Sequence, residues 1–417
     1  MNSHKRWLVL ILAIAFAFRA IAAFAVQQRM DAKSSPQQFL IPGDANGYWE
    51  LAENILAGKG FTVHIPPRLA MRMPGFPLVL AAAIKLTGGN LLAIRLLFAL
   101  AGTLVCGAVY VLGKMLLDER SGLIAAAITA IMPTMAGFSV LILSETLFAL
   151  GLVCSLVAMC KLVSLLNDPD VSRSKLLQCG AGVGLACTLA CYVRPSWLLA
   201  APCFVSLLYL LKRAAGTVHL ATLAVFAGLF LSLLPWAIRN QLAVGRPVLT
   251  TLWVGPSLYD GLNDSATGDS DMTFFKNDDL LQSMTEHEMD QHYRQKAWAF
   301  VAANPGRTIE LGMAKIGRFW KPWPNAQQFK AWWMKAAVAA TFLPLIVLAV
   351  IGGWQMRNQI WVLAFTLGPI IYFTAIHAVF VGSLRYRLPA EYPLCVLSSV
   401  GLQTVWGMRR NSIQTDA

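Results

Sequence analysis

Long apolar blocks joined by short polar connections restrict the fold of this sequence more than any other feature. Ten blocks approach the length of a membrane-crossing helix, at about 7–26, 91–117, 123–138, 146–166, 176–193, 197–211, 218–238, 336–354, 360–381 and 389–406. Only 13% of the residues are charged, about half the share typical of soluble domains. Hydrocarbon offers no partners to backbone N–H and C=O groups, so such blocks form helices. The sequence therefore predicts an all-α polytopic membrane protein.

An eleventh apolar stretch, Phe76 to Gly88, would reach only about 20 Å as a helix and falls short of the hydrocarbon core. The positive-inside rule decides how it is counted. Basic residues mark the tails and short connections at Lys5, Arg6, Lys114, Arg120, Lys161, Arg173, Lys175, Lys212, Arg213, Arg357, Arg409 and Arg410. All of them face the cytoplasm if the eleventh stretch is a partial or re-entrant helix. We therefore expect about ten spans plus a half-helix, with both termini cytoplasmic.

The first block has one competing interpretation. Ala23-Phe24-Ala25 at its end resembles a signal-peptide cleavage site. The block is long enough to span the membrane and contains Arg19, so a retained anchor is the favoured interpretation.

This topology divides the chain into three regions. Residues 1–238 form an N-terminal transmembrane core with an external loop at 27–75, residues 239–334 form a second external region, and residues 335–417 hold the last spans and a short tail. The formal net charge of +13 is then largely a signal of orientation, so nucleic acid is not an expected partner. We expect the external side to be the periplasmic face of a bacterial inner membrane.

The first external loop contains an amphipathic helix that opens at Asp44. Tyr48, Leu51 and Ile55 recur at helical spacing, so this helix can lie on the membrane surface. In one interpretation Asp44 is a helix cap. In the other it is a carboxylate at the membrane surface that acts as a general base.

Several arginines gather at the external boundary, where the positive-inside rule predicts few: Arg72, Arg194, Arg239, Arg385 and Arg387. Snorkelling explains any one of them. Together they suit a phosphate group, which guanidinium binds through two hydrogen bonds.

Two acidic residues interrupt apolar sequence. Glu145 must pair with a cation or face a polar cavity, or else it lies in the first turn of a helix that Ser144 caps. Glu391 follows Arg385 and Arg387 and is expected to neutralise one of them.

Neither the cysteines nor the acidic residues of the second external region show a metal pattern. All eight cysteines lie in apolar blocks, where they are expected to be small apolar side chains buried in the membrane. Asp264, Asp269 and Asp271 lack the spacing of a calcium loop, so a solvated loop is expected and a hard-cation site is the alternative. A helix is predicted from Glu286 to Trp298, before Asn304-Pro305-Gly306 ends it.

The ordered motifs resemble those of the GT-C superfamily of membrane glycosyltransferases, of the protein O-mannosyltransferase and lipid A aminoarabinose transferase type. The resemblance rests on Gly43-Asp44-Ala45 before Tyr48, Arg72-Met73-Pro74-Gly75-Phe76-Pro77, Leu143-Ser144-Glu145, Tyr192-Val193-Arg194-Pro195, Pro235-Trp236-Ala237-Ile238-Arg239-Asn240 and Arg385-Tyr386-Arg387-Leu388-Pro389. It implies a GT-C-like bundle with external amphipathic helices.

The resemblance also implies roles for the residues at these motifs. Asp44 would be the catalytic base, Glu145 a second active-site acid, and Tyr48 a substrate-binding residue. The five external arginines would bind the donor phosphate. The first loop lacks an obvious Asp-Glu pair, which leaves the acceptor open.

These inferences predict a hexosyl- or pentosyltransferase that uses a polyprenyl-phosphate-linked sugar and inverts the anomeric centre. The acceptor would be a lipid, a glycan or a protein. Because the arginines supply positive charge, no metal cofactor is expected. The alternatives are a flippase or transporter for lipid-linked saccharides and a non-catalytic subunit of envelope assembly.

Overall fold

The computed structural model describes residues 3–32, 38–212, 216–278, 280–324, 329 and 331–407. In this part of the chain the regular structure is helical, apart from one isolated β-bridge between Val63 and Arg68. Arg213, Asp279, Arg409 and Arg410 lie outside the described residues.

Seven helices are long and apolar enough to cross a membrane. They are α1 (Ser3–Asp31), α4 (Leu91–Leu116), α7 (Glu145–Leu165), α8 (Arg173–Val193), the segment Pro195–Lys212 that combines the 3-10 turn η1 (Pro195–Trp197) with α9 (Ala200–Lys212), α10 (Gly216–Val244) and α16 (Trp332–Gln355). Two bent pairs pass the same test as broken spans: α5 (Glu119–Ile131) with α6 (Pro133–Val140), at 62°, and α17 (Ile360–Thr366) with α18 (Gly368–Val379), at 46°. Proline follows each break, as expected where a helix cannot continue.

The candidate spans of the described residues number seven to nine, rather than the ten predicted. The tenth predicted segment forms α19 (Leu384–Val405), which is long enough but not apolar enough to pass. Most of its side chains are buried, and it packs against α16, α5, α7 and α18. A helix enclosed by other helices meets protein instead of lipid, so it tolerates polar residues.

The predicted half-helix is α3 (Gly75–Thr87), a 13-residue helix that ends at Gly88 in the left-handed conformation. Its length of about 20 Å agrees with a partial span. A Cβ atom at Gly75 would lie 2.7 Å from the carbonyl oxygen of Tyr192, so only glycine lets the start of α3 approach the end of α8 this closely. This contact brings the segment before α3 next to Arg194.

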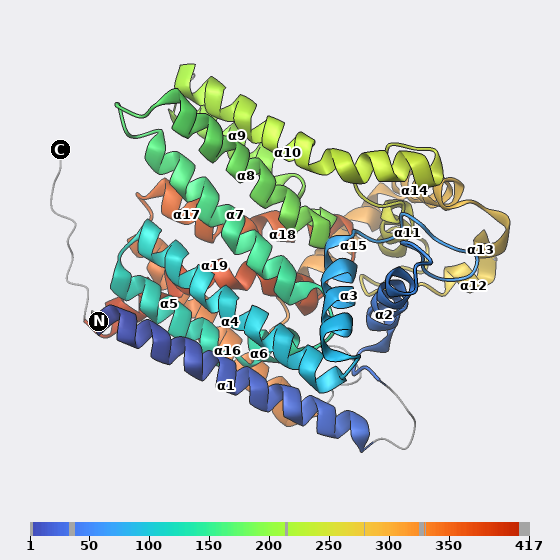
Figure 1. Ribbon diagram of the computed structural model, residues 1–417, viewed down its shortest axis with the longest axis horizontal. Coiled ribbons are helices and arrows are strands. Elements are labelled where there is room, and N and C mark those ends of the chain that lie inside the picture. The colour runs from blue at the N-terminus through green and yellow to red at the C-terminus, as the bar shows by residue number, and fades with distance from the viewer. Residues whose placement is uncertain are drawn as a thin grey trace.

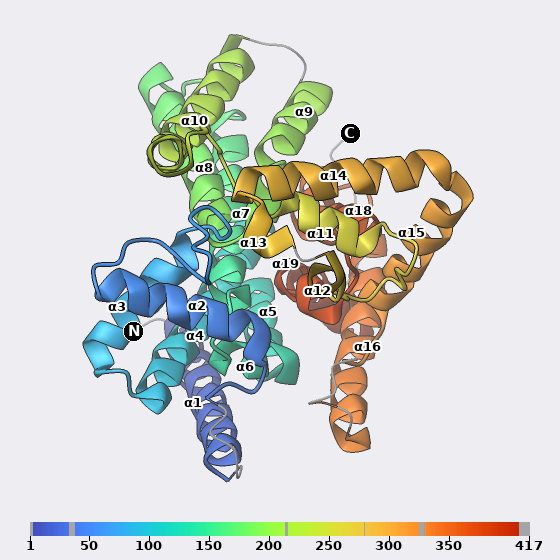
Figure 2. The same ribbon diagram turned by 90° about the vertical axis from the view of Figure 1, so that its right-hand side faces the viewer.

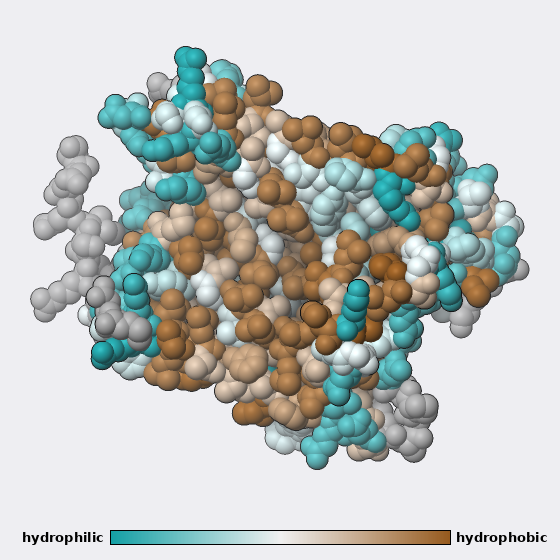
Figure 3. All heavy atoms as spheres, viewed as in Figure 1, coloured by the Kyte–Doolittle hydropathy of each residue, from teal (hydrophilic) through white to brown (hydrophobic). Residues whose placement is uncertain are grey.

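The remaining helices lie together at one end of the bundle (Figure 1). We call residues 38–74 and 245–324 the cap. It contains α2 (Pro42–Leu56), α11 (Val254–Gly261), α12 (Phe274–Asp278), α13 (Leu280–Ser283), α14 (Glu286–Ala303) and α15 (Pro305–Trp320). The α4–α5 and α7–α8 connections, which predicted cytoplasmic basic residues flank, lie at the opposite end (Figure 1). A band of hydrophobic surface separates two hydrophilic ends (Figure 3). The all-α polytopic membrane fold is therefore confirmed.

Local predictions in the cap also agree with the structure. The helix predicted from Glu286 is α14, and a capping box between Thr285 and Glu288 starts it. Asn304 ends this helix and Pro305 begins the next.

The eight cysteines lie in helices of the bundle, and all of them are free thiols.

Small residues set the distance between neighbouring membrane helices. α8 packs against α10 along Gly180 and Gly184, a glycine pair at the spacing that permits close helix contact. A Cβ at Gly184 would lie 2.2 Å from the carbonyl oxygen of Val225, whereas a Cβ at Gly182 would meet nothing within 4 Å.

We predict that Gly184→Ala destabilises the protein by about 1–3 kcal/mol, because α8 and α10 must separate to admit the methyl group. Gly182→Ala, on the same helix, is expected to be neutral or slightly stabilising. Thermal unfolding in detergent, followed by tryptophan fluorescence, compares the two variants. Equal melting temperatures would contradict the packing described for α8 and α10.

Candidate active site

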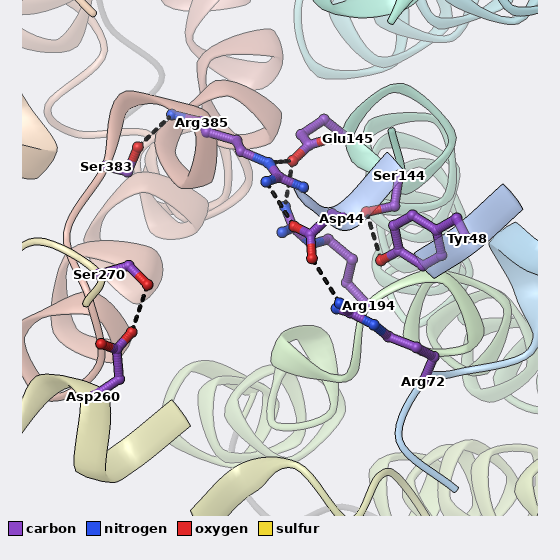
Figure 4. A network of polar contacts seen from close by, with 10 residues as sticks. All are labelled: Asp44, Tyr48, Arg72, Ser144, Glu145, Arg194, Asp260, Ser270, Ser383 and Arg385. Carbon is purple, nitrogen blue, oxygen red and sulfur yellow. Dashed lines mark hydrogen bonds and ion pairs between the residues drawn. The ribbon is translucent and has the colours of Figure 1, made fainter. Parts of the chain in front are cut away.

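Five segments far apart in the sequence converge where the cap meets the bundle. They are α2 with Asp44 and Tyr48, the segment before α3 with Arg72, the start of α7 with Ser144 and Glu145, the end of α8 with Arg194, and the start of α19 with Arg385. Their polar side chains point toward one another (Figure 4). We call Asp44, Tyr48, Arg72, Glu145, Arg194 and Arg385 the junction cluster.

Asp44 is held by two arginines from different elements. Its Oδ1 lies 2.7 Å from Nη2 of Arg72, and its Oδ2 lies 2.7 Å from Nη1 of Arg385. Burial alone would raise the pKa of Asp44, but Arg72, Arg385 and Arg194 outweigh it and hold this pKa well below its usual range. The carboxyl group is therefore ionised at neutral pH.

One interpretation of the sequence made Asp44 the cap of α2, and this interpretation is wrong. The helix begins at Pro42, a residue suited to the first position of a helix, and the N-cap residue is Ile41. Asp44 therefore lies inside the first turn, where a negative charge is favourable, and its side chain is free to pair with the arginines.

Glu145 is the fully buried acid of the junction cluster. Its Oε1 pairs with Arg385 and lies 3.4 Å from Nη1 of Arg194. Ser144 is the N-cap residue of α7 and Glu145 lies in the first turn, as one interpretation predicted, but the Ser144 side chain makes no capping hydrogen bond. The Ser144 hydroxyl instead accepts a long 3.5 Å hydrogen bond from Tyr48.

Arg385 is the residue that connects both acids. One guanidinium group contacts Asp44 of the cap and Glu145 of the bundle (Figure 4). Its Nη2 and the Oε2 of Glu145 are buried and have no hydrogen-bond partner within the described part of the chain. Buried charged atoms without partners are costly, so both are suited to receive groups of a ligand.

The junction cluster has an excess of positive charge, because its three arginines face two carboxylates. Aromatic rings support all three arginines: Arg72 lies 5.1 Å from the ring centre of Tyr48, and Arg194 and Arg385 lie 5.1 Å and 6.0 Å from that of Tyr386. Tyr386 was not assigned a role from the sequence. Its position between two arginines in Arg385-Tyr386-Arg387 is the sequence feature that could have identified it as part of the site. Such a cluster can bind an anion with one negative charge more readily than a cation.

Two predicted phosphate ligands lie outside the junction cluster. Arg239 donates to the carbonyl oxygens of Leu69 and Phe61, and it stacks on the rings of Phe61 and Trp236. Arg387 is fully buried, pairs with Glu391 at 2.5 Å and donates to the carbonyl oxygen of Phe319. The prediction that Glu391 neutralises one of the two neighbouring arginines is confirmed. Internal groups thus bind Arg239 and the Nε and Nη1 of Arg387, whereas the Nη2 of Arg387 is buried without a partner among the described residues.

Two of the three acidic residues of the cap that suggested a cation site have protein partners. Asp269 pairs with Arg318, and Asp271 accepts a hydrogen bond from the backbone N–H of Thr273. Among the described residues, no group of three or more His, Cys, Asp or Glu side chains is arranged to hold a metal ion.

Comparison with known proteins agrees with this fold. Residues 71–238 match the family model described as dolichyl-phosphate-mannose-protein mannosyltransferase. No match is found among curated proteins.

Three solved structures are among the matches, and the two with a TM-score above 0.5 show the similarity in fold. Archaeal oligosaccharyltransferase AglB from Archaeoglobus fulgidus, in complex with an inhibitory peptide and a dolichol-phosphate, is 14% identical, with a TM-score of 0.60 over 98% of this chain and 51% of that chain. The oligosaccharyltransferase of the same organism in complex with Zn and sulfate is 15% identical, with a TM-score of 0.58 over 95% and 49%. ArnT from Cupriavidus metallidurans bound to undecaprenyl phosphate is 14% identical, with a TM-score of 0.40 over 96% and 79%.

The chain spans about half the length of the oligosaccharyltransferase chains that it matches. At these identities the structural likeness concerns the fold. The resemblance to the GT-C superfamily that the sequence motifs suggested is confirmed.

We predict that Arg385→Gln destabilises the protein by about 2–4 kcal/mol, because it leaves buried Glu145 with only the longer Arg194 contact. Arg307→Gln is the control, since it removes the exposed pair with Glu310 and is expected to cost less than about 1 kcal/mol. Melting temperatures in detergent measure both. Equal shifts in the two variants would show that Arg385 does not join the cap to the bundle.

Proposed function

We propose that the protein is a membrane glycosyltransferase that moves a sugar from a polyprenyl-phosphate donor to an acceptor at the junction of cap and bundle. The observation that carries this proposal is the Asp44 carboxylate, held between Arg72 and Arg385 beside buried Glu145. A carboxylate and several guanidinium groups are the two components that the reaction requires. The dolichol-phosphate bound in the archaeal oligosaccharyltransferase AglB supports a lipid phosphate as the donor's carrier.

Each part of the junction cluster takes one role in the reaction. Asp44 accepts the proton of an acceptor hydroxyl while the acceptor oxygen bonds to the anomeric carbon. The bond from that carbon to the phosphate oxygen breaks, and polyprenyl phosphate leaves with the bonding electrons. Arg72, Arg194 and Arg385 stabilise the charge that grows on this phosphate. Attack opposite the leaving group inverts the anomeric configuration.

The resting ion pairs make Asp44 a weak base, and the donor removes this limitation. Its phosphate competes with Asp44 for the same guanidinium groups. As Arg72 and Arg385 turn to the phosphate, the interactions that depress the pKa of Asp44 weaken and its basicity rises. Glu145 remains as the partner of Arg194 and limits how far the arginines can move.

The cap would lie on the periplasmic face of a bacterial inner membrane. The observation that favours this side is the concentration of basic connections at the opposite end of the bundle (Figure 1). Whether the sugar is a hexose or a pentose, and whether the acceptor is a lipid, a glycan or a protein, depends on contacts beyond the junction cluster.

We predict that Asp44→Asn lowers sugar transfer by at least about 100-fold, because an amide cannot accept the proton. The assay uses purified protein in lipid vesicles with a panel of polyprenyl-phosphate sugars and envelope extracts as acceptors. Glu53→Gln is the matched control, since Glu53 lies on the same helix and its carboxylate hydrogen-bonds Trp49 and no other described residue.

Two results would contradict this assignment. Equal transfer by wild type and a folded Asp44→Asn variant would exclude the carboxylate as the base. Movement of lipid-linked saccharide across vesicles without any transfer would favour the flippase alternative.

We predict that transfer continues in EDTA, because the Arg385 guanidinium already lies between the Asp44 and Glu145 carboxylates, where a metal-dependent site would hold its cation. The Zn and sulfate in one archaeal oligosaccharyltransferase structure make a divalent metal the alternative to test. Activity lost in EDTA and restored by Mg²⁺, Mn²⁺ or Zn²⁺ would overturn this prediction.

A further inference from the structure

The segment that carries Arg72 is held by a distant glutamate of the cap. The carboxylate of Glu286, at the start of α14, accepts the backbone N–H of Leu69 at 2.9 Å and that of Ala70 at 3.0 Å. More than 210 residues of sequence separate the two sides of this contact. Glu286 is buried, so its carboxylate depends on these donors.

Arg68 strengthens the same attachment from the opposite direction. Its guanidinium donates to the carbonyl oxygen of Leu281 within α13 at 2.5 Å, and to that of Met284, directly after α13, at 3.2 Å. Figure 2 shows the loop that follows α2 beside α13 and the start of α14. Burial raises the pKa of Glu286, and the two N–H groups, with Arg68 and Arg239 nearby, offset part of that effect.

One residue of the bundle and one of the cap hold the other side of the segment. Arg239 of α10 donates to the carbonyl oxygens of Leu69 and Phe61, and the N–H of Leu252 donates to the carbonyl oxygen of Ala70 at 2.9 Å. Leu69 and Ala70 therefore have both their N–H and their C=O groups bound by residues from other parts of the chain. Such a segment cannot shift without breaking several hydrogen bonds at once.

Arg72 follows Ala70 by two residues, a reach of about 7 Å along the backbone. We propose that Glu286 is a positioning residue that fixes the Leu69–Ala70 backbone so that Arg72 meets the phosphate of an anionic lipid donor. Arg239 has the same role on the bundle side, in place of the direct phosphate contact predicted from the sequence. This inference rests on the proposed function and makes the 239–334 region part of the donor site.

A double-mutant cycle tests whether Glu286 acts through Arg72. The probe is undecaprenyl phosphate, titrated into purified full-length protein in lipid nanodiscs, and the readout is its dissociation constant. We expect Arg72→Gln to weaken binding by at least about tenfold, since it removes a charge-assisted hydrogen bond. Glu286→Gln is expected to weaken binding by about three- to tenfold, and the double variant no more than Arg72→Gln alone.

Glu288→Gln is the matched control. Glu288 lies in the same first turn of α14, and within the described part of the chain its carboxylate hydrogen-bonds Thr285 alone, so its loss weakens the helix start without touching Leu69 or Ala70. Its dissociation constant should equal that of wild type. If Glu286→Gln fails to fold, Arg239→Gln replaces it in the same double-mutant cycle. This variant tests whether the bonds from the bundle to the Leu69–Ala70 backbone position Arg72.

The outcomes separate this inference from the proposed function. Additive losses in the double variant, or an equal loss in Glu288→Gln, would overturn the positioning role while leaving the phosphate site intact. Unchanged binding in a folded Arg72→Gln variant would overturn both the phosphate site and the positioning of Arg72.

Discussion

One guanidinium group connects the two halves of this molecule. Arg385 starts the innermost helix of the bundle and contacts Asp44 of the cap and Glu145 of α7. Each of these charges would be costly alone at a membrane boundary, because desolvation penalises an unpaired ion more than pairing rewards it. The charges are therefore tolerated only as a set, and the set can form only when the first cap helix, α7 and α19 have reached their final positions.

Charge at an apolar boundary was a reliable guide to the site. Asp44, Tyr48, Arg72, Glu145, Arg194 and Arg385 were all selected from the sequence, and the structure brings them together. The reason is physical, since an ionised group that interrupts apolar sequence must find a partner or a ligand. Their individual roles stay predictions until the variants are assayed.

The sequence did not separate the arginines that face the site from those that do not. Arg385 and Arg387 are two residues apart on a helix, so their side chains are rotated by about 200° about the helix axis and leave nearly opposite faces. Only Arg385 reaches Asp44. The pairing of Arg387 with Glu391 had a readable signal, an acid four residues further along the helix. Arg239 and Glu286 had no such signal, because their partners are backbone groups of a loop. The sequence also did not show that α19 is enclosed by other helices. Because an enclosed helix does not face lipid, α19 can carry polar residues and is less apolar than a predicted span.

The same arginines cannot serve Asp44 and a donor phosphate fully at one time. In the structure Asp44 takes the place of the anion and keeps the cluster close to neutral. A donor with one negative charge would complete the neutralisation and release Asp44 as a base. After transfer the departing phosphate carries a second negative charge, but Asp44 carries the acceptor's proton, so the three arginines and Glu145 still balance the phosphate. On the proposed function, the charge of the cluster therefore favours donor binding before acceptor activation, and it favours release of the lipid phosphate once Asp44 has lost this proton and regained its negative charge.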